Sequence, residues 1–225
     1  KSMKLKITTL ALSLLTFLNV SAQKKEFVKS DSIIYPIHKS SIGKIAFMDQ
    51  TIAIENYKET DFLKSFELKD IFDCGQCFRW NKESDESYTG VFKQNVINVK
   101  KQGQDVYFKG ICSGDIKNVV TYYFDLERDY ENIKKTLSKV DINMKTSIEY
   151  GKGIRILNQD LWETIISFII SANNNIPRIK GIIEKLSKTY GNEIIWNNNK
   201  YYTFPSVNQL KDVTIEQYRK LGLGF

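Results

Sequence analysis

The sequence predicts an α+β fold, in which an antiparallel, β-rich N-terminal domain is followed by the beginning of an all-α domain. Two observations carry this prediction. Between residues 55 and 112, stretches rich in Val, Ile, Phe and Tyr are separated by polar turns, a pattern typical of strands in hairpins. From Asp115 onward, the apolar residues recur at helical spacing. With 225 residues, of which 42% are hydrophobic, the chain can bury the cores of one or two domains.

The β-rich part is expected to contain hairpins, and residues 55–112 to consist of strands and turns. Residues 88–99 carry strand-forming residues interrupted by polar ones. Residues 101–105 form a polar turn that contains a glycine, and residues 106–108 follow as a further strand.

Helices are expected over residues 116–123 and 129–138, and a third helix should end near Gly151, because glycine suits the end of a helix. Residues 151–225 are predicted to be helical throughout. The first helix of this part has an apolar stripe so wide that we expect it to be almost entirely buried. The stripe consists of Leu161, Ile165, Phe168 and Ile169, extended by Ile166 and Ile170.

Three asparagines, Asn173–Asn175, should interrupt that helix. A second helix is expected to start around Pro177, with Asn175 as its N-cap, and to end at Gly191. Near the C-terminus, Thr214 and the glutamine three residues later form a capping box before a short helix.

The first 47 residues differ from the rest. Residues 1–23 resemble a secretory signal peptide, with three lysines, a short apolar run and small residues before Gln23; a buried amphipathic helix is the alternative. Residues 24–47 show little periodicity. We therefore expect the functional unit to begin near Met48 and residues 1–47 to be foreign to it. The expected domains are then residues 48–150 and 151–225.

The net charge of +7 is unevenly distributed. Residues 1–47 hold eight Lys or Arg against two Asp or Glu, and residues 48–150 hold 15 against 18. Residues 151–225 hold 10 against 6, a net charge of +4. A local electrostatic argument for nucleic-acid binding therefore applies to residues 151–225, whereas a general one for the whole chain is weak.

Cys74 and Cys77 form a C-x-x-C motif, which could indicate a secreted thiol-disulfide oxidoreductase. Such a motif should open a helix, but here an aromatic segment and a polar turn follow. Cys112 and His38 are poor candidates to complete a zinc site. With His38 in the leader, a Ser/His or Cys/His catalytic pair is not expected, and no P-loop or Rossmann fingerprint is present.

Two longer segments are more specific. The pattern G-Q-x-F-R-W lies within Phe72–Trp80, and the pattern S-x-N-N-N-I-x-R-I lies at Ser171–Ile179. In this order they resemble the signatures of the 8-oxoguanine DNA glycosylases, which belong to the helix-hairpin-helix superfamily. The segments Gly153–Asp160, Phe204–Ser206 and Leu221–Phe225 extend the resemblance, which covers roughly residues 50–225.

The resemblance implies four site residues. Gly75 matches the glycine whose carbonyl accepts a hydrogen bond from N7–H of 8-oxoguanine in the flipped-out base. Asn173 matches the asparagine that fills the space left by that base, and Arg178 the arginine that reads the orphaned cytosine. Phe225 falls where the family places an aromatic wedge. Each residue also has a structural interpretation. Gly75 could be a turn glycine, Asn173 could end or cap a helix, Arg178 could be a solvated helix residue, and Phe225 could be a core aromatic.

The resemblance also implies the activity of the parent protein. We expect a DNA glycosylase with AP-lyase activity that removes 8-oxoguanine opposite cytosine, acting as a monomer in the cytoplasm on damaged double-stranded DNA, without metal, cofactor or membrane. The family's catalytic lysine and aspartate lie beyond Phe225, so no catalytic residue is assigned here and this fragment is expected to be inert alone. A non-catalytic damaged-DNA-binding fragment is the second alternative to the redox protein.

Overall fold

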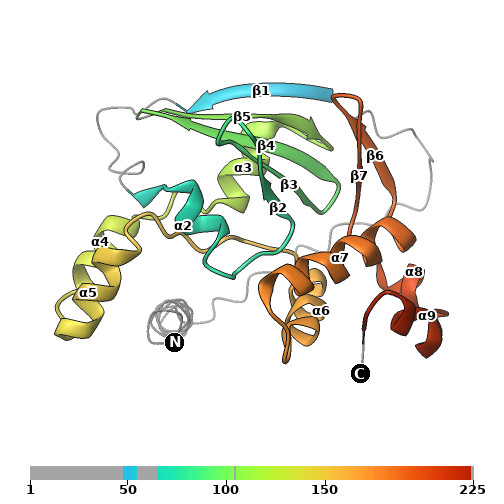
Figure 1. Cartoon of the computed structure of the whole chain (residues 1–225). Helices are drawn as coiled ribbons and strands as arrows, with labels where there is room; N and C mark the ends of the chain where they lie inside the picture. The colour runs from blue at the N-terminus through green and yellow to red at the C-terminus, as the bar shows by residue number, and fades with distance from the viewer. Residues whose placement is uncertain (1–47, 55–64, 104, 224–225) are drawn as a thin grey trace, which may run out of the picture.

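A five-stranded antiparallel sheet forms the first half of the molecule. The computed structural model describes residues 48–54, 65–103 and 105–223. The strands follow one another across the sheet in the order β1-β5-β4-β3-β2 (Figure 1). Their bounds are Met48–Ile54 for β1, Trp80–Lys82 for β2, Tyr88–Phe92 for β3, Asn95–Gln102 for β4 and Asp105–Cys112 for β5. The expected hairpins are confirmed, with residues 88–99 divided between two strands.

The turn predicted at residues 101–105 is tighter than expected, because Gln102 still pairs with Asp105. Two elements of this half were missed, of which the first is β1, because it lies before residue 55, where the strand-rich segment was predicted to begin. Residues Leu68–Phe72 form a short helix, α2, within the segment predicted to contain only strands and turns. Five residues make little more than one helical turn, which is too short to show a helical period in the sequence.

Beneath the sheet, α2 and α3 (Ile116–Tyr123) close an aromatic core (Figure 1). The ring of Phe72 stacks on Trp80 with centroids 4.3 Å apart, and the Trp80 indole N–H donates to the Tyr123 hydroxyl at 2.9 Å. Phe124 lies edge-on to Phe72 and is fully buried. Since aromatic side chains bury large areas, this cluster is the main source of stability in the sheet half.

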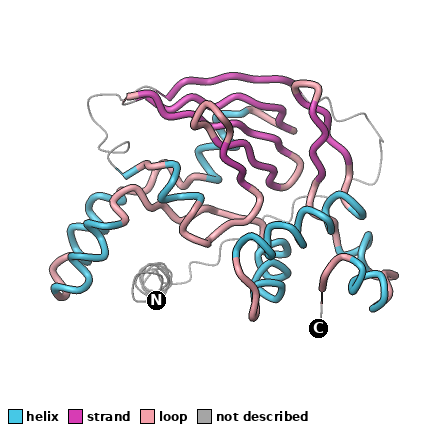
Figure 2. Tube along the Cα trace, in the orientation of Figure 1, coloured by secondary structure: helices cyan, strands magenta, loops and turns pink. Residues whose placement is uncertain are grey.

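Two helices, α4 (Tyr130–Leu137) and α5 (Ile142–Tyr150), form a pair at one end of the molecule (Figure 1). Their N-caps are aspartates, whose carboxylates accept from backbone N–H groups in the first turn. The helices predicted at residues 129–138 and before Gly151 are confirmed. A loop then runs from α5 back across the molecule to α6 (Figure 2).

The second half contains α6 (Leu161–Ser171), α7 (Ile176–Tyr190), α8 (Val207–Leu210) and α9 (Ile215–Lys220). The prediction that residues 151–225 are helical throughout is wrong, because β6 (Glu193–Trp196) and β7 (Asn199–Tyr202) form a hairpin there. Between the strands, Asn197 and Asn198 both have positive φ, at 48° and 59°. Two such residues between β-branched and aromatic ones favour a two-residue hairpin turn, a signal that was present in the sequence.

The prediction that α6 is almost entirely buried is also wrong. In this structure only Ser167 and Ile170 of the helix are buried. Leu161 and Phe168 are 73% and 77% exposed, and Ile169 is 61% exposed. The apolar stripe read from the sequence is real, but nothing in the described part of the chain covers most of it.

Several expectations fall outside the described residues: the leader at residues 1–23, the foreign segment at residues 24–47, His38 and Phe225. Among the residues that the structure describes, no helix is long and apolar enough to cross a membrane.

Candidate functional site

Gly75 lies in an exposed turn that follows the C-terminal end of α2. Its φ of +87° belongs to the left-handed region, where glycine is favoured. No atom lies within 4 Å of the position that a Cβ at Gly75 would occupy. The turn therefore needs glycine for its backbone conformation and leaves open space beside it, so that a ligand could approach the backbone closely.

The turn is placed between the two halves of the molecule. Trp80 belongs to the aromatic core of the sheet half, whereas Phe78 packs against the helical cluster that contains Ile179 and Ile182 of α7. The ammonium group of Lys180, also on α7, donates to the Trp80 carbonyl at 2.7 Å. Residues 78–80 thus fix the position of the Gly75 turn relative to α7.

Arg79 is buried and its guanidinium donates to the Tyr202 carbonyl in β7. Burial lowers the pKa of this guanidinium, while Glu163 on α6 opposes that effect. Arg79 and Trp80 are thus structural residues that join the sheet to the second half, and neither is exposed for contact with a ligand.

The redox interpretation of the two cysteines is contradicted by their environment. Cys74 and Cys77 are free thiols, and they follow the end of α2 instead of opening a helix. Burial raises the pKa of the Cys74 thiol, and raises that of Cys77 further. A reactive thiol needs a lowered pKa, so this pair lacks the property on which thiol-disulfide exchange depends. In the described residues no group of His, Cys, Asp and Glu could hold a metal ion.

Asn173 lies in the loop between α6 and α7. It is exposed and has a φ of +59°, which is uncommon for a residue other than glycine but is tolerated by asparagine. Its neighbours have structural roles: Asn174 donates to the Ile170 carbonyl at 2.7 Å, and Asn175 caps α7 as predicted. Asn173 thus differs from the other two asparagines, because among the described residues neither capping nor a side-chain hydrogen bond accounts for it.

Arg178 lies exposed in the first turn of α7, one turn after Asn175. Its backbone N–H donates to the Asn175 carboxamide at 3.0 Å, and its guanidinium donates to the Gly222 carbonyl at 3.3 Å. The structure therefore brings Arg178 to the segment that precedes Phe225, which itself lies outside the described residues. The weak contact to Gly222 leaves most of the guanidinium donors available to a ligand.

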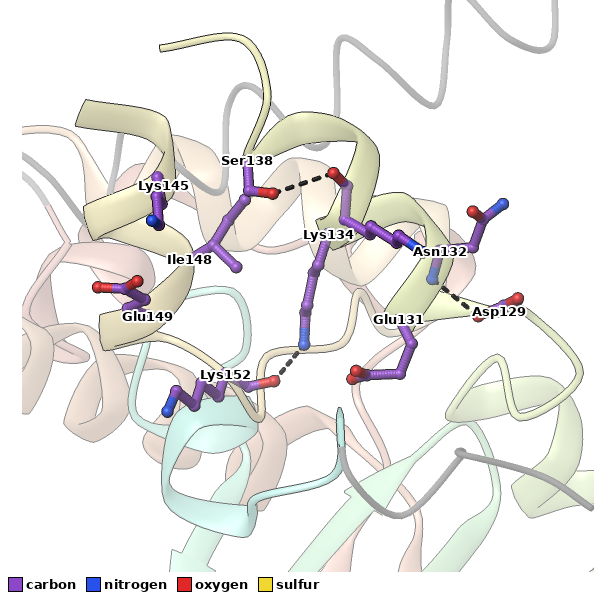
Figure 3. Close-up of a pocket in the computed structure, with 10 residues that line it drawn as sticks. Asp129, Glu131, Asn132, Lys134, Ser138, Lys145, Ile148, Glu149 and Lys152 are labelled. Atoms are coloured by element: carbon purple, nitrogen blue, oxygen red, sulfur yellow. Dashed lines mark hydrogen bonds between the residues drawn. The ribbon is translucent and has the colours of Figure 1, made fainter. Parts of the chain in front are cut away.

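A cavity of about 660 Å³ lies elsewhere, between α4 and α5 (Figure 3). Charged side chains of both signs line it, among them Lys134, Lys135, Glu131 and Glu149. The ammonium group of Lys134 donates to the Lys152 carbonyl, and burial lowers the pKa of Lys134 to about 8. None of the site residues expected from the sequence lines this cavity, so it is separate from the candidate site.

Sequence reasoning missed the side chains that hold the site together. Gln76 stands inside the recognised pattern but received no role, although its side chain makes three hydrogen bonds to residues 71, 155 and 157. Arg155 was also missed, and it is completely buried. A glutamine and an arginine carry no periodic signal, so only the recognised patterns around them could have drawn attention to either.

Comparisons with known proteins point to one family. Residues 59–165 match the family described as 8-oxoguanine DNA glycosylase, N-terminal domain. An N-glycosylase/DNA lyase of Arabidopsis thaliana is 28% identical over 159 residues, which are 68% of this chain and 44% of that protein. A yeast N-glycosylase/DNA lyase, from Saccharomyces cerevisiae, is 29% identical over 177 residues, 70% of this chain and 46% of its own length.

Among solved structures, the 8-oxoguanine glycosylase/lyase of Clostridium acetobutylicum is similar both without DNA and in complex with double-stranded DNA that contains cytosine opposite 8-oxoguanine. The complex gives a TM-score of 0.72 at 42% identity and covers 80% of this chain and 60% of that one. The chain spans about half the length of the two curated relatives, those of Arabidopsis thaliana and Saccharomyces cerevisiae. On its sequence patterns, its fold and these similarities, the chain belongs to the 8-oxoguanine DNA glycosylase family.

Proposed function

We propose that this chain supplies the damage-recognition part of a DNA glycosylase/AP lyase that removes 8-oxoguanine opposite cytosine. The observation that carries the proposal is the exposed Gly75 turn, which has a positive φ and open space beside the glycine Cα, at the junction of the two halves. Its support from outside the chain is the 42% identical Clostridium acetobutylicum protein, whose structure contains cytosine opposite 8-oxoguanine.

The chemistry at Gly75 would rest on a single proton. Guanine presents a lone pair at N7, whereas 8-oxoguanine carries a hydrogen there. A carbonyl directed at that atom accepts a hydrogen bond from the lesion but faces a second lone pair in the normal base. A buried polar group left without a partner costs about 1–3 kcal/mol, which is enough for a discrimination of one order of magnitude or more.

Asn173 and Arg178 would act inside the duplex, at the base pair from which the lesion has been flipped out. Once the lesion is flipped out, Asn173 occupies the space that it leaves, and Arg178 meets the acceptors of the orphaned cytosine with its paired donors. Both side chains are exposed and come from one loop and the helix that follows it. Phe225 is proposed as the wedge beside them.

The proposal is tested by the affinity of the 225-residue chain for four duplexes, with 8-oxoguanine or guanine opposite cytosine or adenine. We expect the unchanged chain to bind most tightly to the duplex with 8-oxoguanine opposite cytosine. An Arg178→Ala variant should lose affinity for this duplex by roughly tenfold or more and should gain no preference for any of the other three duplexes. Lys188→Ala is the matched control, because it removes a cation from the last turn of the same helix. Equal affinity of the unchanged chain for all four duplexes would contradict the proposal.

Excision is proposed to require residues that the family carries beyond the matched part. In such enzymes a lysine amine attacks C1′, expels the base and forms a Schiff base. Incubation of the 225-residue chain with the damaged duplex and borohydride is therefore expected to give no covalent protein–DNA adduct. An adduct would place the nucleophile within these 225 residues.

A further inference from the structure

Gly75 itself is loosely surrounded, because no atom lies within 4 Å of the position that a Cβ would occupy, whereas Cys74 and Cys77 on either side pack into core clusters. The hydrogen bonds that connect the turn to a distant segment come from the next residue, Gln76. The Gln76 carboxamide donates to the carbonyls of Ile71 and Arg155, both at 2.8 Å, and accepts from the Leu157 N–H at 3.0 Å. The Gln159 side chain completes the bridge by donating to the Gln76 carbonyl at 2.6 Å.

From this geometry we infer that Gln76 is the positioning residue of the base-recognition turn: it fixes the direction of the Gly75 carbonyl relative to the segment 155–159. The inference rests on the proposed function of Gly75. It matters because a hydrogen bond weakens steeply when its angle departs from linear, so a carbonyl that turns loses its ability to distinguish the lesion. Gln76 is thus proposed as a determinant of specificity that does not itself touch the base.

The bridge connects the turn to a segment that is itself anchored. Arg155 is fully buried, its Nε donates to the Phe124 carbonyl at 3.1 Å, and its guanidinium lies 4.2 Å from the centre of the Tyr130 ring. Just before it, the Gly153 N–H donates to the Asp70 carboxylate in α2 at 3.0 Å. Both ends of the bridge therefore stay in place without Gln76, and its loss should loosen the turn alone.

The same segment leads directly into α6. Asp160 caps that helix by accepting from the Glu163 N–H at 3.0 Å, and the helix ends at the loop that carries Asn173. Gln76 therefore ties the turn that holds Gly75 to the element that positions Asn173. One carboxamide sets the geometry between the residue that reads the flipped base and the residue that fills its place.

Glutamine is the side chain that this position requires. Its two N–H groups reach two carbonyls while its oxygen accepts from an N–H, so donors and acceptor are all used. A glutamate keeps the acceptor but turns a carboxylate oxygen toward two carbonyls. A leucine keeps the approximate volume and removes all three hydrogen bonds.

The test compares Gln76→Leu with Gln209→Leu, the matched control. Gln209 is also half-buried and also uses both ends of its carboxamide, but it lies in α8. The readout is the ratio of the dissociation constants for duplexes with guanine and with 8-oxoguanine opposite cytosine, a ratio from which the folded fraction cancels. We expect Gln76→Leu to reduce this preference about tenfold or more and Gln209→Leu to leave it unchanged.

Amide hydrogen exchange without DNA provides a second readout. Gln76→Leu should speed exchange at residues 73–77 and at the Leu157 N–H, and should leave the strands β3 and β4 protected. An unchanged preference in Gln76→Leu, with the unchanged chain still favouring 8-oxoguanine, would overturn the inference while the proposed function stands. If the unchanged chain shows no preference, the proposed function is wrong, and unchanged exchange at residues 73–77 would then overturn the role of Gln76 as well.

Discussion

The sheet half and the helical half of the molecule differ in how completely their large apolar side chains are buried. In the sheet half the large aromatic side chains are enclosed, and Phe66, Trp80 and Phe124 are each at most 1% exposed. In the helical half Leu161 and Phe168 of α6 are 73% and 77% exposed, and an apolar hollow of about 280 Å³ lies between α6, α8 and α9. The stability of the described chain therefore resides mainly in the sheet half.

This difference matters for the site, because its residues come from both halves. Gly75 stands on the enclosed half and is held by Gln76, whereas Asn173 and Arg178 stand on the half that leaves an apolar face uncovered. Under the proposed function, recognition would depend on the junction between an enclosed region and a less enclosed one. Substitutions on either side should separate the contributions of the two halves.

The largest effect is expected from Trp80→Ala. The indole is 1% exposed, stacks on Phe72 and lies so close to Gly90 that a Cβ there would be 2.2 Å from its ring. Replacing it should lower the free energy of unfolding by about 3–5 kcal/mol, since it removes a large buried aromatic and leaves a cavity. Urea unfolding followed by fluorescence and circular dichroism measures this. A loss below about 1 kcal/mol would mean that the sheet core is not the main source of stability.

An intermediate effect is expected at the junction. Burial raises the pKa of the Glu163 carboxyl to about 7 from an ordinary value of 4.5, although Arg79 acts to lower it. An acid with a raised pKa keeps its proton in the folded state, so the contribution of Glu163 to stability is largest below about pH 4.5 and falls as the pH rises to 7.

Glu163→Gln removes this loss, because glutamine resembles the protonated acid at every pH. Since Glu163 is not completely enclosed, we expect the variant to be more stable than the unchanged chain by about 1–2 kcal/mol at pH 8 and equally stable at pH 4. Thermal unfolding at the two pH values measures the difference. Equal gains at both would show that ionisation of Glu163 is not the cause.

The smallest effect is expected from Phe168→Ser on α6. Its side chain is 77% exposed, so little burial is lost and the free energy of unfolding should change by less than about 0.5 kcal/mol. The variant should instead reduce concentration-dependent self-association, which a large exposed apolar face promotes. Sedimentation velocity checks the latter, and a destabilisation comparable to that of Trp80→Ala would show that Phe168 is enclosed in solution.

Local chemistry in the sequence was a reliable guide to much of this structure. Asn175 predicted the start of α7 because its side chain satisfies a backbone N–H there, and the strand pattern predicted the hairpins. The hairpin after Gly191 was missed because the whole segment 151–225 was predicted to be helical, although Asn197 and Asn198 marked a turn. The exposure of α6 could not be read from its stripe, since periodicity shows which side chains are apolar and not what covers them.

The candidate site also contains residues that the sequence predicted and residues that it did not. Gly75, Asn173 and Arg178 were assigned to the site from recognisable patterns and stay predictions, and the first two have a positive φ in the structure. Gln76 and Arg155 were missed, because their importance lies in hydrogen bonds between segments far apart in the chain. Such bonds depend on tertiary structure and leave no periodic signal in the sequence.

The central claim, that Gly75 reads the lesion, is tested most directly by Gly75→Ala beside Gly103→Ala. Both glycines have positive φ, +87° and +61°, and open space around the added Cβ, so both substitutions should cost similar backbone strain of about 1 kcal/mol. The measurement is the preference for a duplex with 8-oxoguanine over one with guanine, each opposite cytosine. We predict that Gly75→Ala loses this preference and Gly103→Ala keeps it. An equal preference in the two variants and the unchanged chain would contradict the account.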